Sequence, residues 1–82
     1  MKVRLRPHAQ ARLAEHGATE QEVAAAVEHG EQFTAKFGRT GFRRNFRFGR
    51  TWRGRTYATK QIEAYAVPEQ GWLVITVIVK FF

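Results

Sequence analysis

Two cations interrupt the apolar faces of neighbouring predicted strands, and they are the first residues in this sequence that suggest chemistry. In TYATKQIEAY, residues 56–65, strict alternation places Lys60 on the same face as Ile62. Arg44 falls in the same way on the face that carries Phe42. Because a buried, unpaired charge is costly, each cation must reach water, an acidic partner, or a site that uses positive charge.

The reaction that such cations suit is cleavage of RNA by the substrate's own 2′-hydroxyl group. This reaction needs one group that accepts a proton, one that gives a proton, and cations for the charge that builds on the phosphate. His8 and Lys60 could transfer protons, and Arg12, one helical turn after His8, could hold the phosphate together with Arg44. Either of two hydroxyl groups, on Tyr57 or Thr76, could act as a neutral donor. The sequence thus predicts a metal-independent endoribonuclease with catalytic residues His8, Arg12, Arg44, Tyr57, Lys60 and Thr76.

The same residues also have purely structural explanations. Lys60 could extend its amine to water at the edge of the sheet, and Arg44 could pair with Glu15 or Glu63. A histidine beside an arginine on the first helix is typical of a solvated helix face. His16 falls at a predicted helix end, where a cation favours the helix dipole.

A metal-dependent nuclease is the main chemical alternative. The sequence contains no Asp, and its close carboxylate pair, Glu20 and Glu22, falls on the surface of a predicted helix. Three scattered histidines without any cysteine do not match a zinc site. There is no glycine-rich phosphate loop and no Ser-His-Asp pattern. We therefore predict no metal site and no cofactor.

Positive charge concentrated in the middle of the chain predicts the kind of molecule that the protein binds. The chain carries fourteen Lys and Arg against seven acids, all Glu, for a net charge of +7, and residues 36–60 hold nine of the cations and no acid. Aromatic residues alternate with these cations, a combination that suits single-stranded RNA. The alternative is that the charge keeps a small protein soluble or attracts an acidic protein. The predicted RNA contacts are Arg39, Arg43, Arg47, Arg50, Trp52, Arg53 and Arg55.

Two short helices followed by strands must position these residues. Pro7 suits the first turn of a helix that ends at Gly17, and a capping box over residues 19–22 starts a second helix that ends before Gly30. Alternation with a period of two then predicts strands over residues 33–37, 42–48, 56–65 and 72–82, joined by turns. A short strand over residues 3–5 could precede the first helix. The predicted fold is α+β, with two N-terminal helices packed on a four- to five-stranded antiparallel sheet.

Length and composition bound the class of protein. At 82 residues the chain predicts a single domain over residues 1–82 with a small core. The absence of cysteine suits a reducing compartment. There is no apolar segment of the length that a signal peptide or a membrane span needs, so we predict a cytoplasmic protein that does not associate with membranes.

Several stretches resemble a known bacterial family. The stretch HAQARLAEHGATEQEV, followed by GEQF, resembles the opening of the family catalogued as domain of unknown function 4258, which reads His-Ala-x-x-Arg before a glycine and Glu-Val. GRTYATKQIEAYAV and WLVITVIVKFF are similar to its second half. His8 and Arg12 match the motif, Lys60 and Thr76 match the second half less specifically, and Ala18 stands where the family more often has Ile.

That family is regarded as similar to the RelE/ParE toxins and, more widely, to the barnase, EndoU, colicin and RelE ribonuclease fold. The resemblance implies a RelE-like fold and a toxin of a toxin–antitoxin pair that cuts RNA without metal. It also implies a second partner, an acidic antitoxin that covers the basic sheet. Because relatives in this superfamily include gyrase poisons without nuclease activity, a non-catalytic module that binds nucleic acid or protein is the alternative.

Overall fold

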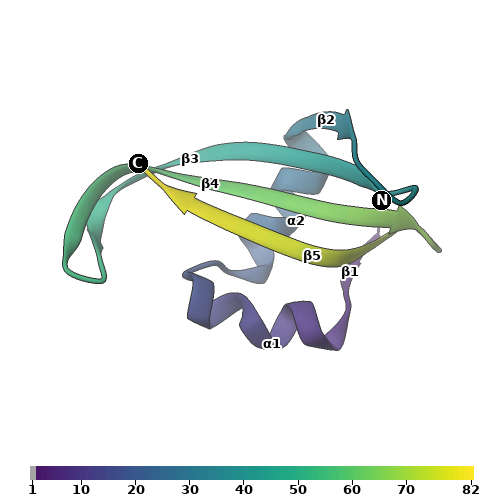
Figure 1. Ribbon diagram of the computed structural model, residues 1–82, viewed down its shortest axis with the longest axis horizontal. Helices are drawn as coiled ribbons and strands as arrows, with labels where there is room; N and C mark the ends of the chain where they lie inside the picture. Colours follow the sequence, from purple (N-terminus) through teal and green to yellow (C-terminus); the bar gives the residue numbers. More distant parts are fainter. Residues whose placement is uncertain (1) are drawn as a thin grey trace.

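The computed structural model describes residues 2–82, which form two helices and five strands. In chain order these are β1 (Val3–Leu5), α1 (Pro7–His16), α2 (Glu20–His29), β2 (Glu31–Thr34), β3 (Thr40–Trp52), β4 (Arg55–Pro68) and β5 (Trp72–Phe81). The strands make one sheet in the order β1-β5-β4-β3-β2. Both helices lie on one face of this sheet, and within residues 2–82 no element covers the other face (Figure 1). The predicted α+β class, with two helices on a sheet, is confirmed.

Local sequence signals account for both helices. Pro7 occupies the first turn of α1, and Gly17 ends it in the left-handed conformation with φ of 78°. At the start of α2, the Glu22 amide donates to Thr19 Oγ1 (3.2 Å) and the Thr19 amide donates to Glu22 Oε1 (3.0 Å). Gly17 is required for a second reason, because a Cβ there would lie 3.0 Å from the Trp52 ring. The two helices therefore begin and end where the sequence predicts.

The sheet is mixed, so the prediction of a wholly antiparallel sheet is wrong at one edge. β2–β3, β3–β4 and β4–β5 pair antiparallel, as short turns require, but β1 pairs parallel with β5. Both helices separate β1 from the next strand, so no tight turn fixes the direction in which β1 lies. β1 covers only residues 72–74 of β5.

The long β3–β4 hairpin also differs from the prediction. β3 does not end at Phe48 but continues to Trp52, and the turn lies at Arg53 and Gly54, which both have positive φ. The strand passes the expected turn residue Gly49 by means of a β-bulge, in which two residues of β3 lie opposite Ala58 of β4. The hairpin tip consequently extends well past the helices (Figure 1).

The core lies between the helices and one face of the sheet. Its largest fully buried side chains are Val23 of α2, Ile62 of β4 and Val74 of β5. Several buried alanines, including Ala26 and Ala64, let the helices approach the strands closely. Since one face of each central strand is used in this way, alternate residues of β3, β4 and β5 are presented on the open face.

Neither helix within residues 2–82 is both long and apolar enough to cross a bilayer.

Candidate active site on the open face of the sheet

Lys60, the cation that interrupts the apolar face of β4, is enclosed beneath the α1–α2 connection. Its side chain is only 5% exposed. The amine donates to the Gly17 carbonyl oxygen (2.9 Å) and contacts both carboxylate oxygens of Glu22, at 2.9 and 2.7 Å. These contacts tie the helix connection to the central strand and hold the amine on the face of the sheet that the helices cover.

Three of the predicted catalytic residues do meet. His8, Arg12 and Thr76 line a hollow of about 160 Å³ between α1 and β5, together with His16. We call this the helix groove. The Lys60 amine donates to Gly17, the residue that follows α1. Gly17 lies nine positions after His8, and nine residues span roughly 13 Å along a helix. The predicted pairing of His8 and Lys60 around one phosphate is therefore not assembled.

Arg44 and Tyr57 lie apart from the helix groove and from each other. Arg44 Nη1 donates to the backbone oxygen of Ala25 in α2 at 3.5 Å, so it pairs with neither of the carboxylates considered from the sequence. Tyr57 packs against Phe81, with ring centroids 5.5 Å apart. The six predicted catalytic residues thus do not form one site: three line the helix groove, Arg44 and Lys60 contact α2 about one turn apart, and Tyr57 packs against Phe81.

Most of the predicted RNA contacts on the hairpin lie against neighbouring aromatic rings. Trp52 stacks on Phe81, with centroids 5.3 Å apart and planes at 19°, so this face of the indole is not free for a base. Three guanidinium groups lie over aromatic rings at distances of 4.8 to 5.8 Å, those of Arg50, Arg53 and Arg55. Arg47 is exposed and Arg39 lies beside a separate hollow at the β2–β3 turn.

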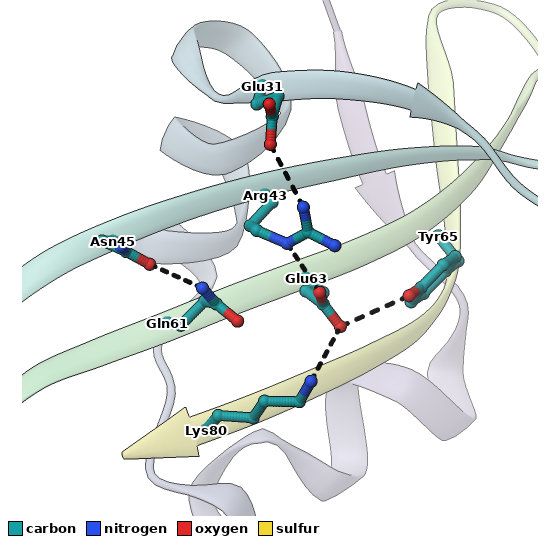
Figure 2. A network of polar contacts seen from close by, with 7 residues as sticks. All are labelled: Glu31, Arg43, Asn45, Gln61, Glu63, Tyr65 and Lys80. Atoms are coloured by element: carbon teal, nitrogen blue, oxygen red, sulfur yellow. Dashed lines mark hydrogen bonds and ion pairs between the residues drawn. The ribbon is translucent and has the colours of Figure 1, made fainter. Parts of the chain in front are cut away.

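A cluster of charged and polar side chains crosses the open face of the sheet (Figure 2). We call it the open-face cluster. Strand register places Glu63 of β4 directly opposite Arg43 of β3, and Arg43 directly opposite Glu31 of β2. Four neighbouring strands contribute its members, which are Glu31, Arg43, Glu63, Tyr65 and Lys80.

Glu63 is the centre of this cluster. Its side chain is only 6% exposed, although it lies on the open face. Arg43 Nε donates to Glu63 Oε2 at 2.7 Å, and the Tyr65 hydroxyl donates to Oε1 at 3.3 Å. Lys80 Nζ lies 3.9 Å from Oε1, on the side away from Arg43 (Figure 2). A carboxylate on the central strand is therefore flanked by one cation from each neighbouring strand.

The surroundings of Arg43 and Tyr65 favour the protonated forms of both side chains. The hydrogen bond to Glu63 is the main cause that raises the pKa of Arg43, and the pairing with Glu31 adds to it. Burial is the main cause that raises the pKa of Tyr65, and the negative charge of Glu63 raises it further. The Tyr65 hydroxyl is therefore held as a neutral donor to the carboxylate.

This arrangement holds the groups that phosphodiester cleavage requires. A carboxylate can accept a proton, two cations can contact phosphate oxygens, and a neutral phenol fixes the carboxylate. The simpler explanation is that cross-strand charge pairs stabilise an exposed sheet face. Within residues 2–82 there is no group of three His, Cys, Asp or Glu side chains positioned to hold a metal ion.

Reasoning from the sequence missed most of this cluster. It assigned Arg43 to RNA binding and gave no catalytic role to Glu63, Tyr65 or Lys80. Alternation does place Arg43 on the face opposite Arg44, but the partner strand's register is needed to find Glu63. If the register at the hairpin turn continued without a bulge, Arg43 would lie opposite Ala64. The bulge shifts the register by one residue, so that Arg43 lies opposite Glu63, whose side chain is on the other face of β4.

The fold and the cluster together define an α+β domain with helices on one face of a mixed sheet and a cluster of paired acidic and basic side chains on the other. Comparisons of the chain with protein-family models, with curated proteins and with solved structures found no match. The resemblance to the domain of unknown function 4258 family therefore stays a prediction, and a function must be inferred from the site itself.

Proposed function

We propose that this protein is a small endoribonuclease whose active site is formed by Arg43, Glu63, Tyr65 and Lys80 of the open-face cluster and whose reaction uses the 2′-hydroxyl of RNA in place of a metal-bound water. The observation that carries the proposal is the enclosed carboxylate of Glu63 between Arg43 and Lys80. The site differs from the one predicted from the sequence. Lys60 becomes a structural residue, and Glu63 takes the role of proton acceptor.

The proposed reaction is an intramolecular attack within the RNA strand. The 2′-hydroxyl gives its proton to Glu63 while its oxygen forms a bond to phosphorus, and the bond from phosphorus to the 5′-oxygen breaks. Arg43 moves one hydrogen bond from Glu63 to a phosphate oxygen, where it stabilises the developing negative charge. Lys80, whose side chain is 58% exposed, contacts the other side of the phosphate and gives a proton to the departing 5′-oxygen. The products are a 2′,3′-cyclic phosphate and a 5′-hydroxyl end.

The surrounding charge supports RNA as the substrate. The net charge of +7 attracts a polyanion, and the exposed Arg47 continues the row of cations along the open face. We further propose a RelE-like toxin of the cytoplasm, supported by the order of two helices before the long antiparallel strands and by the lack of cysteine. In that role an acidic antitoxin would bind the open face and inhibit cleavage.

A cleavage assay tests this proposal. We expect the purified protein to cut a labelled single-stranded RNA in the presence of EDTA and to leave a 2′,3′-cyclic phosphate, which mass spectrometry identifies. The same oligonucleotide with 2′-O-methyl groups throughout should stay intact, because it has no free 2′-hydroxyl. Cleavage of the methylated strand, or intact RNA at high protein concentration, would contradict the proposal.

The second candidate is a non-catalytic module that binds nucleic acid. The observation that favours it is the short contact between Glu63 and Arg43, which satisfies the carboxylate without any substrate. This candidate predicts binding that weakens steeply with salt and no product at any time. The cleavage assay separates the two, because both candidates bind RNA and only the first changes it.

A further inference from the structure

A second hollow, next to the open-face cluster, has no role in the proposed reaction. It has a volume of about 620 Å³ and lies at the β2–β3 turn. Three aromatic rings line it, those of Phe33, Phe37 and Tyr65, together with the cations Lys36 and Arg39. We call it the aromatic hollow. Tyr65 belongs to both sites, since its ring lines the hollow and its hydroxyl bonds to Glu63.

Phe37 is an unusual residue for its position. It has φ of 62°, Gly38 after it has φ of 70°, and the Arg39 amide donates to the Lys36 oxygen at 3.2 Å, a pattern typical of a type I′ turn. Asn, Asp or Gly is strongly preferred at the first of the two central positions. The Phe37 side chain is also 88% exposed. An aromatic residue that is unfavourable for the turn and adds little to the core points to a ligand.

The other rings of the hollow are held in place. Phe33 lies across Gly41 so closely that a Cβ on Gly41 would overlap the ring. The Arg43 guanidinium covers Phe33 at 4.5 Å from the ring centroid, and Tyr65 meets it edge to face at 6.0 Å. The hollow is therefore a preformed aromatic wall with one exposed ring and two cations at its rim, and no acidic side chain lines it.

We propose that the aromatic hollow binds one nucleobase of a single-stranded RNA, stacked on Phe37, with its phosphate contacted by Lys36 and Arg39. This inference rests on the proposed function and deepens it, because it states where the strand lies beside the cleaved bond. Aromatic rings stack on any base, and a base is attached to the negative charge that the two cations match. The shared Tyr65 places this base next to the phosphate at Glu63.

The substitution Phe37→Asn tests the proposal, because it separates turn stability from ligand binding. Asn suits the turn better, so the Tm should rise by a few degrees. Binding of a fluorescein-labelled 2′-O-methyl RNA, measured by anisotropy, should weaken about 10-fold through the lost stacking. Phe82→Ala, which removes another exposed aromatic residue next to Thr59 at the opposite end of β4, is the matched control and should bind like the wild type.

Abasic oligonucleotides identify the contact. Removing one base at the preferred position should weaken binding to the wild type about 10-fold and leave binding to Phe37→Asn almost unchanged. Wild-type affinity in the Phe37→Asn variant, or a fall in its Tm, overturns the nucleobase site while the proposed function stands. Tight binding that depends on Phe37, without cleavage of unmodified RNA, supports the base site and overturns the ribonuclease. No binding by the wild type overturns both.

Discussion

Replacing Glu63 by Gln is expected to lower the rate of RNA cleavage about 100- to 10,000-fold, the range typical of a lost general base. The amide has nearly the same size as the carboxylate, and its oxygen can still accept a hydrogen bond from Arg43, but it cannot take a proton from the 2′-hydroxyl. Single-turnover cleavage should therefore fall while the affinity for a 2′-O-methyl RNA changes little. Both quantities are measured at a temperature well below the Tm of the variant.

Glu31→Gln is the matched control for this experiment. Glu31 contacts the same arginine, Arg43, at 3.1 Å, but its side chain is exposed on the edge strand β2. We expect its substitution to change the cleavage rate less than about threefold, in line with the small energies of exposed ion pairs. Because Glu63→Gln alters a nearly enclosed network, Lys80→Met provides an independent variant on the exposed side of the site, and its cleavage rate should also fall. Cleavage by Glu63→Gln at the wild-type rate would remove Glu63 from the reaction.

The second large effect concerns stability. We expect Glu22→Gln to lower the free energy of unfolding by about 3 kcal/mol, because it leaves the Lys60 ammonium enclosed with a carbonyl oxygen and a neutral amide. Glu22 is itself 22% exposed, which places the effect at the lower end of the range for broken buried pairs. The capping box should survive, because the Gln oxygen can accept from Thr19. Urea unfolding followed by tryptophan fluorescence measures the change.

Two further variants make this stability test specific. Glu15→Gln removes an exposed carboxylate 3.9 Å from Arg12 and should change stability by less than about 0.5 kcal/mol. The double variant Lys60→Met/Glu22→Gln should recover much of the lost stability, since no charge is left enclosed. It should also cleave RNA at nearly the wild-type rate. A folded double variant without activity would restore the catalytic role that the sequence suggested for Lys60.

The parts of the fold that the sequence predicted are those set by nearby residues. The capping box at Thr19 and the glycine after α1 specify the helix ends through contacts within four residues. The direction of β1 depends on its pairing with residues 72–74 of β5, and the bulge in β3 depends on its register with β4, so no pattern within a single strand could reveal them. The same difference explains the strand ends, where Gly49 looks like a turn residue but lies within β3.

The candidate active site shows the same difference between contacts of nearby residues and contacts between distant parts of the chain. Alternation correctly singled out Lys60 as a cation on an apolar face, but its partner Glu22 is 38 residues away. No sequence spacing rule links these two residues, because their contact depends on how α2 packs against β4. Glu63 was overlooked for the opposite reason, because a lone Glu on a strand resembles an ordinary exposed residue until its cross-strand neighbours are known.

The closed environment of the Lys60 amine has a consequence for chemical labelling. The chain has four lysines, and three of them, Lys2, Lys36 and Lys80, are exposed. Acetic anhydride should therefore acetylate these three amines quickly in the native protein and reach the fourth only after unfolding. Bound RNA should slow acetylation of Lys36 and Lys80 but not of Lys2, so a single peptide map would report both the integrity of the helix layer and the footprint of the substrate.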